Sequence, residues 1–319
     1  MIKMTPVSKP IVFGASGFIG QHFIKKVGLD KCLPITRTAQ GCNNWIEADL
    51  LKLNSIKSAL KLSATVINLA YSYQSSANEN IRMAKNLAQT CLQSNISRLI
   101  HCSTAMVFGN NSSSFLDEES ICYPETIYEK TKYDIERIFL EVASDKLKVC
   151  ILRPTGVIGA GGQNLKKMLF KIRHGNSITN FIRSSIHGTR LLNLIPVKDV
   201  VRALLHLTEY TSISSGIFIC SADDDPNNRY DKVEELMRSF LMKQPRIKSI
   251  KLPTFFLNML LQIYRSGSGC FANRYYSAEK LFSTGFQRSI SISNAISDFV
   301  GAVDNLNLVA KKEGSRQNE

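Results

Sequence analysis

The sequence predicts an α/β fold in which a doubly wound parallel sheet is joined to a smaller C-terminal α/β lobe. Up to residue 152, short apolar runs alternate with amphipathic stretches, and the first apolar run leads directly into a glycine-rich turn. Strands that alternate with helices need crossover connections, which build parallel sheets. The chain has 319 residues, and because single cores stop growing at roughly 250–300 residues, we expect a second, smaller unit.

The alternation defines five strands and four helices in the first half. The strands are expected at Pro10–Phe13, Cys32–Thr36, Thr65–Leu69, Arg98–Ser103 and Lys148–Leu152. The helices are expected at Ile19–Val27, Ile56–Leu62, Asn80–Ser94 and Tyr128–Ala143. Beyond Arg153 follow an apolar run at Leu191–Val197 and helices near Val200–Thr208 and Lys232–Phe240.

These elements suggest a division of the chain into two units. Residues 8–155 form the first unit, to which 191–210 return, and residues 156–190 and 211–308 form the second. The polar end, 309–319, is expected to be a flexible tail. The apolar run Phe255–Tyr264 is too short to cross a bilayer and is interpreted as a buried helix.

Composition points to a cytoplasmic globular protein rather than a secreted, membrane or disordered one. Hydrophobic residues make up 44% of the chain, which is too many for a disordered protein. The start lacks the apolar core of a signal peptide, and no apolar run reaches the ~18 residues of a membrane span. The eight cysteines form no CxxC pair, so the sequence predicts neither a zinc site nor a disulfide framework.

The net charge of +14 is concentrated in the second half. From Lys146 to Lys198 there are ten Lys and Arg residues and no carboxylate. Such a region creates a positive field that attracts phosphates. Because it lacks interleaved aromatic residues and any nucleic-acid motif, we expect a small phosphorylated ligand and not a nucleic acid.

The glycine-rich turn has the spacing of a dinucleotide-binding loop. In GASGFIG, which follows the first strand and opens a helix, the glycines are Gly14, Gly17 and Gly20. Their expected roles are a tight turn, close approach of backbone N–H groups to a pyrophosphate, and close packing of helix on sheet. The first unit is therefore predicted to be a Rossmann domain that binds NAD(H) or NADP(H).

The end of the second strand favours NADP(H). Rossmann domains that bind NAD carry an acidic residue there for the ribose 2′-hydroxyl, but this chain has Arg37 between Thr36 and Thr38. An arginine can pair with a 2′-phosphate, although NAD(H) stays possible. Asp49 and Leu50 are expected beside the adenine.

The strand at Thr65–Leu69 has a small-residue exit, which would leave room for the nicotinamide half of the dinucleotide to lie across the strand ends. Leu69 and Ala70 are the residues of this exit.

Tyr128 and Lys132 are candidates for the proton chemistry. They stand four positions apart at the start of a predicted helix, so both side chains lie on one face. A lysine ammonium lowers the pKa of a nearby phenol, which can then exchange a proton with a substrate oxygen.

Taken together, GASGFIG, the STAMVFG segment at 103–109 and YEKTK at 128–132 resemble the extended short-chain dehydrogenase/reductases, in particular the NAD-dependent epimerase/dehydratase family. The resemblance covers about residues 10–305 and implies a homodimeric enzyme that acts on a nucleotide sugar. It implies that Thr104 binds the reacting oxygen, that Tyr128 is the acid/base, and that Lys132 also holds the nicotinamide ribose.

The resemblance also implies further contacts. The other residues expected at the dinucleotide are Ser16, Phe18, Ile19, Tyr71, Asn80 and Thr155. Those expected at the substrate, beside Thr104 and Tyr128, are Asn164, Leu165 and Arg190.

Departures from the family pattern narrow the reaction. Ala105 and Met106 stand where the family's dehydratases carry an acidic pair, which argues against dehydration. We expect a NADPH-dependent 4-ketoreductase of a nucleotide-diphosphate sugar, with an NAD-dependent 4-epimerase as the alternative. A reductase of a flavonoid-like or steroid-like compound would need no anion site, and a non-catalytic dinucleotide sensor would not need Thr104, Tyr128 and Lys132.

Overall fold

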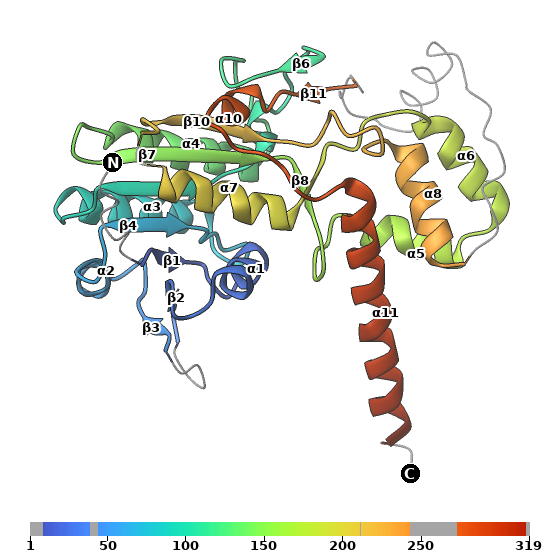
Figure 1. The fold of residues 1–319 in the computed structure, drawn as a ribbon, viewed down its shortest axis with the longest axis horizontal. Helices are drawn as coiled ribbons and strands as arrows, with labels where there is room; N and C mark the ends of the chain where they lie inside the picture. Colours follow the sequence, from blue (N-terminus) through green and yellow to red (C-terminus); the bar gives the residue numbers. More distant parts are fainter. Residues whose placement is uncertain (1–8, 39–43, 211, 243–272, 317–319) are drawn as a thin grey trace.

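A seven-stranded, wholly parallel sheet forms the centre of the protein in the computed structural model, which describes residues 9–38, 44–210, 212–242 and 273–316 (Figure 1). The strand order is β10-β7-β5-β4-β1-β2-β3. The strands are β1 (Ile11–Phe13), β2 (Leu33–Thr36), β3 (Ile46–Glu47), β4 (Thr65–Asn68), β5 (Arg98–Cys102), β7 (Lys148–Pro154) and β10 (Gly216–Cys220). The order reverses between β1 and β4, which is where doubly wound sheets bind their ligands.

Helices cover both faces of this sheet, so its strands are buried on both sides. Helices α2 (Leu53–Leu60), α3 (Ala77–Leu92) and α4 (Ile127–Glu141) cover one face, and α1 (Phe18–Val27) and α7 (Val197–Glu209) cover the other. Along β1 the side chains alternate: Ile11 and Phe13 belong to the core under α2–α4, and Val12 to the core under α1 and α7. Burial on both faces explains why these strands appear as continuous apolar runs.

A smaller lobe lies beyond the carboxyl ends of the strands, to the right in Figure 1. It contains the helices α5 (Lys166–His174), α6 (Ser177–His187), α8 (Tyr230–Phe240) and α11 (Ile292–Arg316). The strands β8 (Gly156–Ile158) and β9 (Leu194–Pro196) pair beside it. A second short pair, β6 (Phe115–Leu116) with β11 (Tyr275–Tyr276), and the helix α10 (Glu279–Ser283) lie above β10. The predicted architecture of a parallel sheet with a smaller lobe is confirmed.

The structure corrects several sequence-based boundaries. Residues 216–220, placed by sequence in the lobe, form β10, which pairs with β7 along its full length and extends the main sheet. The basic region contains α5 and α6, which the sequence analysis did not predict. The apolar run at Leu191–Val197 is divided, because β9 ends at Pro196 and α7 begins at Val197.

Two predictions concern the C-terminal part of the chain. Phe255–Tyr264 lies outside the described residues. The segment expected as a tail from residue 309 is helical as far as Arg316, as the end of α11. None of the described helices has the length and apolarity that a membrane crossing requires.

Candidate active site

The glycine loop joins β1 to α1 in a conformation that demands glycine. Gly14 has φ +76°, and a Cβ there would lie 2.6 Å from the carbonyl carbon of Leu69, the residue after β4. A Cβ at Gly20 would lie 2.3 Å from Gly14 O and 2.5 Å from Ala15 O. Helix α1 has no side-chain cap and no acidic residue in its first turn. This end of α1 is thus suited to bind an anionic group through backbone N–H donors.

A cavity of about 320 Å³ opens in front of this loop, where the strand order reverses. Of the residues predicted at the dinucleotide, eight line it: Gly14, Ser16, Gly17, Arg37, Leu50, Leu69, Ala70 and Tyr71. Sequence reasoning assigned no role here to Phe13, Ile35, Ala48, Ser72 and Met83, which also line it. The cavity has the position and the backbone donors that a dinucleotide needs, so the residues present fit this cofactor.

Arg37 lies exposed at the rim of the cavity, after the end of β2. The turn that carries it is held by Thr36, whose hydroxyl donates to Thr38 O at 3.2 Å. The described residues that line the cavity include no aspartate or glutamate.

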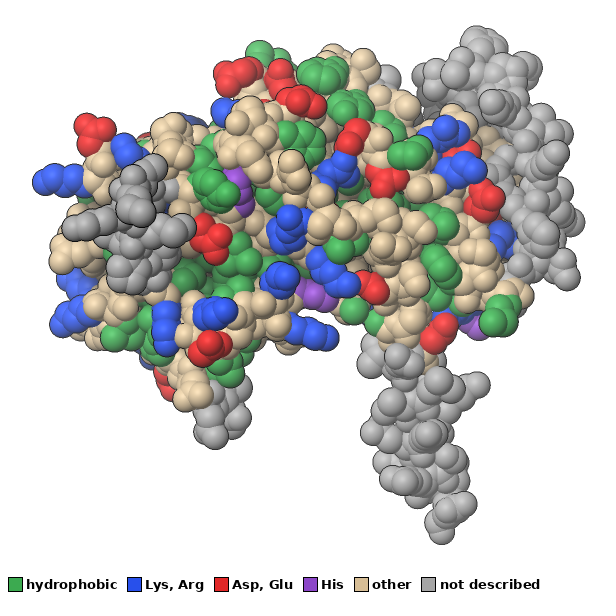
Figure 2. Space-filling model, viewed as in Figure 1, with side chains coloured by type: hydrophobic (Ala, Val, Ile, Leu, Met, Phe, Trp, Pro, Cys, Tyr) green, Lys and Arg blue, Asp and Glu red, His purple; other side chains and the backbone are tan. Residues whose placement is uncertain are grey.

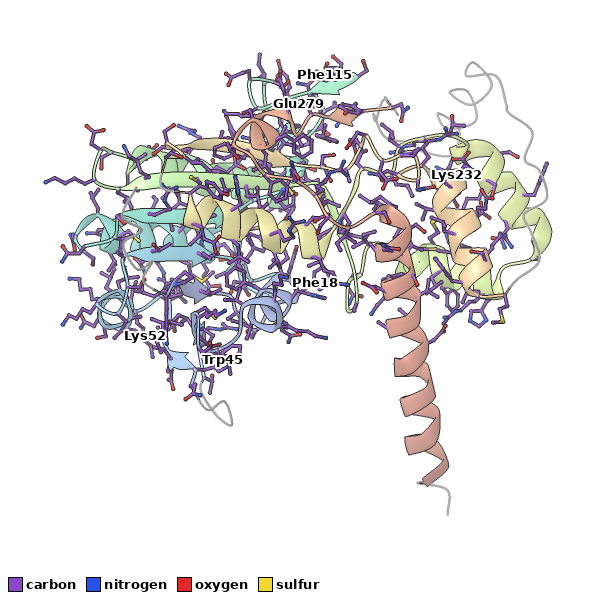
Figure 3. The ribbon with its side chains drawn as sticks, viewed as in Figure 1. Phe18, Trp45, Lys52, Phe115, Lys232 and Glu279 are labelled. Atoms are coloured by element: carbon purple, nitrogen blue, oxygen red, sulfur yellow. The ribbon has the colours of Figure 1, made fainter. Side chains whose placement is uncertain are left out.

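The other residues predicted at the dinucleotide lie outside this lining. Asp49 Oδ1 accepts from Leu51 N–H at 2.9 Å, and the side chain of Ile19 packs against the core. Phe18, labelled in Figure 3, faces the turn after β8, since a Cβ at Gly162 would lie 3.3 Å from its ring. Thr155, at the end of β7, is buried and donates through N–H to Cys220 O at 3.1 Å.

Asn80 lies in α3 and forms hydrogen bonds with the loop that precedes this helix. Its Oδ1 accepts from Ser72 N–H at 2.9 Å, and its Nδ2 donates to Ser72 O and Ser76 O at 2.9 and 3.0 Å. Asn80 is 2% exposed. Its polar atoms therefore fix the chain that carries Tyr71 and Tyr73.

Helix α4 carries Tyr128 and Lys132, and a cap on its first turn fixes their position. Thr126 and Glu129 form a capping box in which each side chain accepts from the other's backbone N–H, at 3.2 and 3.1 Å. This fixes where the helix begins. Tyr128 is half-buried and Lys132 is fully buried in the same face of α4.

The tyrosine and the lysine meet at the ring of Tyr71, which also lines the cavity. The Tyr71 and Tyr128 rings pack edge to face with centroids 5.2 Å apart, and Lys132 Nζ lies 5.4 Å from the Tyr71 centroid. Tyr73, which the sequence analysis did not single out, stacks on Tyr128 at 5.7 Å. The proton-transfer candidates therefore lie at the end of the cavity.

The pKa of Tyr128 differs from the expectation. Burial raises the pKa of the Tyr128 phenol far above its usual range, and the neighbouring Tyr73 raises it further. Lys132 directs its nitrogen elsewhere, donating to Cys102 O at 2.8 Å and lying 3.4 Å from His101 Nε2. Burial also lowers the pKa of Lys132. In the protein without dinucleotide, Tyr128 is consequently a proton-bearing phenol.

Thr104 and Ser103 follow directly on β5. Thr104 Oγ1 accepts from Met106 N–H at 3.2 Å and so caps a short 3-10 turn, Ala105–Phe108. That contact uses the oxygen as acceptor and leaves the hydroxyl proton to be donated. The hydroxyl of Ser103 is buried and has no hydrogen-bond partner in the described part of the chain.

The residues predicted at the substrate are more scattered. Asn164 is exposed and donates to Val157 O at 2.8 Å. Leu165 is 5% exposed and packs in the core under α1 and α7. Arg190 lies between α6 and β9, and its backbone O accepts from Tyr230 N–H at 2.9 Å. Lys and Arg side chains gather between the sheet and the lobe in the face shown in Figure 2.

Comparison with known proteins identifies the family. The model of the NAD dependent epimerase/dehydratase family matches residues 11–218. The chain belongs to this family. It is therefore an enzyme of the NAD(P)-dependent extended short-chain dehydrogenase/reductase group, as the motifs predicted.

Two curated relatives illustrate the range of the family. Human sterol-4-alpha-carboxylate 3-dehydrogenase, decarboxylating, is 28% identical over 59% of this chain and 58% of its own length. The dTDP-4-dehydrorhamnose reductase of Aggregatibacter actinomycetemcomitans is 29% identical over 41% of each chain. This chain thus spans about three fifths of the first relative and two fifths of the second.

Among solved structures, the UDP-Glc/GlcNAc 4-epimerase from Campylobacter jejuni superposes with a TM-score of 0.72 at 18% identity, over 93% of this chain and 99% of that one. At this identity the similarity shows the fold.

Proposed function

We propose that this enzyme is a NADPH-dependent 4-ketoreductase of a nucleotide-diphosphate sugar. The observation that carries the proposal is Arg37 at the rim of the cavity, with no carboxylate among the described residues that line it. A guanidinium there suits a 2′-phosphate, whereas an acidic residue would repel it. The similarity to a dTDP-4-dehydrorhamnose reductase supports the same direction of reaction.

The proposed roles follow from the protonation states. The raised pKa of Tyr128 keeps its proton in place at neutral pH, so Tyr128 donates it to the carbonyl oxygen as that oxygen becomes an alcohol. Thr104 donates a hydrogen bond from its hydroxyl to the same oxygen and orients it, while keeping its own proton. The dinucleotide, held by the glycine loop, Arg37 and Lys132, supplies the hydride. Lys148, Arg153, Arg173 and Lys198 pair with carboxylates outside 146–198, so the attraction for the diphosphate of the substrate is assigned to the other Lys and Arg residues of this segment.

A 4-epimerase is the second candidate, because the fold is shared with a UDP-Glc/GlcNAc 4-epimerase. An epimerase returns the hydride to its own intermediate and shows no net use of cofactor. The sterol relative makes a steroid-like substrate a third class to test.

The experiment is to purify the enzyme, measure the dinucleotide that copurifies, and add NADPH with an NDP-4-keto-6-deoxysugar. Loss of reduced-nicotinamide absorbance in step with product, followed by mass spectrometry, supports the reductase. Tightly bound NAD with interconversion of UDP-glucose and UDP-galactose, and no net oxidation, identifies an epimerase. NAD(P)-dependent turnover of a keto-steroid and of none of the sugars would contradict the nucleotide-sugar assignment.

We further propose a homodimer in which two helices of each copy form a four-helix bundle, as the family resemblance implies. Light scattering on the purified protein tests it.

A further inference from the structure

His101 lies directly under Lys132 and has no role in the scheme above. It belongs to β5, where the sheet register pairs it with Asn68 of β4. The side chain is fully buried, and its ring packs against Phe139 of α4 with centroids 4.9 Å apart. A buried imidazole between an amide and an amine must place its proton on one particular nitrogen.

A hydrogen bond from the backbone of Ala70 determines which ring nitrogen of His101 carries the proton. Ala70 N–H donates to Asn68 Oδ1 at 3.1 Å, and because a backbone N–H cannot accept, the amide oxygen must face it. The amide nitrogen of Asn68 therefore faces His101 Nδ1, at 3.2 Å. An NH₂ group donates, so Nδ1 accepts and carries no proton. Burial lowers the pKa of His101 well below its usual value, so the ring is neutral and its one proton is on Nε2.

Nε2 lies 3.4 Å from Lys132 Nζ. An ammonium has only donors, so it cannot accept from Nε2–H, whereas an uncharged amine can. The amine can still donate to Cys102 O, at 2.8 Å.

The other groups around Lys132 do not reverse this preference. The Cys102 thiol and the Glu136 carboxylate raise its pKa, but burial has the larger, opposite effect. Glu136 is itself paired with the buried Arg153, at 2.6 Å. The Tyr71 ring faces the nitrogen at 5.4 Å and, like Cys102 and Glu136, favours the cation against the effect of burial.

We propose that His101 is a positioning residue for Lys132, whose Nε2–H faces the lysine nitrogen and favours the uncharged amine in the protein without dinucleotide. This inference rests on the proposed catalytic role of Lys132 and on no particular substrate. In this way His101 lowers the pH above which Lys132 loses its proton. With that proton Lys132 loses the positive charge that assists Tyr128.

The first test reads the tautomer directly, by ¹⁵N NMR of the histidine rings in the wild-type protein without dinucleotide. We expect the His101 proton on Nε2 and a bare Nδ1. Asn68→Asp should move the proton to Nδ1, because a carboxylate accepts from both the ring and Ala70. A wild-type proton on Nδ1 would overturn the proposal, without bearing on whether the protein is a reductase.

The second test follows Lys132 by ¹³C NMR of its ε-carbon against pH. His101→Phe keeps the ring packing and removes the N–H, so the titration midpoint should rise by about one pH unit. The control Ile100→Val, next along β5, should leave it unchanged. In the active enzyme, the high-pH limb of kcat/KM should move up by a similar amount in His101→Phe. A midpoint that falls or stays would refute the proposal.

Discussion

Tyr128 is the residue on which the proposed chemistry depends. Its phenol lies half-buried between Tyr71 and Tyr73, and burial raises its pKa far above the usual range. A phenol that keeps its proton to high pH is an acid, which suits reduction of a ketone. The expectation that Lys132 lowers the pKa of Tyr128 is thus corrected, because burial raises this pKa.

Tyr128→Phe should lower kcat by about 10²-fold or more, because it removes the proton donor. Dinucleotide affinity should change little, since the ring and its contacts remain. Stopped-flow kinetics and fluorescence titration with NADPH measure the two effects. Tyr133→Phe, one turn along α4, is the matched control. Retention of more than about a tenth of wild-type kcat would mean that another group supplies the proton.

Arg37→Ala tests the cofactor preference. Loss of a charge-assisted contact of about 1.5–3 kcal/mol should raise the Kd for NADPH by roughly 10- to 150-fold and leave that for NADH nearly unchanged. Lys26→Ala, an exposed cation at the end of α1, controls for net charge. Isothermal titration with both cofactors gives the ratio. Equal weakening of the two would argue that Arg37 does not meet a 2′-phosphate.

At the scale of elements, the junction of β1, the glycine loop and α1 is the most constrained part of the site. Gly20 brings α1 so close to the loop that a methyl group has no room. Capping boxes also fix the start of α3, which contributes Met83 to the cavity, and the start of α4, which carries Tyr128 and Lys132. Elements positioned in this way hold the backbone donors before any ligand binds.

Gly20→Ala should displace α1 from the loop, because its Cβ would lie 2.3 Å from Gly14 O. We expect at least about a tenfold loss of dinucleotide affinity, together with a lower Tm. Gly301→Ala in α11 is the contrast: its Cβ meets nothing within 4 Å in the described part of the chain, so better helix propensity should stabilise the protein by up to about 1 kcal/mol. Calorimetry and NADPH titration separate the effects. Unchanged binding in Gly20→Ala would contradict the role given to this junction.

At the scale of the whole molecule, Asp223 joins the end of the main sheet to β11 and to the residue before β9. It follows β10, and its Oδ2 accepts from Asn193 Nδ2 at 2.7 Å and from Tyr276 N–H at 2.8 Å. Burial raises the pKa of Asp223 to about 6. The carboxyl thus binds its proton more tightly in the folded than in the unfolded chain, where its pKa is about 3.9.

A raised folded-state pKa means that this group's contribution to stability is complete below about pH 4 and is lost as pH rises through 6. The full loss corresponds to roughly 2–3 kcal/mol. Asp223→Asn cannot ionise, so between pH 4 and 7 its free energy of unfolding should improve by about that amount relative to wild type. Urea melts at the two pH values measure it. A difference that does not depend on pH would show that Asp223 titrates normally.

The sequence by itself predicted five strands of the central sheet and the glycine loop that follows the first of them. Glycine spacing after β1 and apolar runs buried on both faces are local signals, and they predicted β1, β2, β4, β5 and β7 within a few residues. The order of Gly14, Thr104 and Tyr128 along the chain was sufficient to indicate the family.

Only the tertiary structure decided those features of the fold and of the candidate site that depend on contacts between segments far apart in the sequence. The placement of β10 in the main sheet follows from its pairing with β7, which no local pattern encodes. Tyr73 and His101 became part of the site only when β4, β5 and α4 were brought together. Burial also reversed the expected shift in the pKa of Tyr128, because desolvation depends on the packed surroundings and not on sequence spacing.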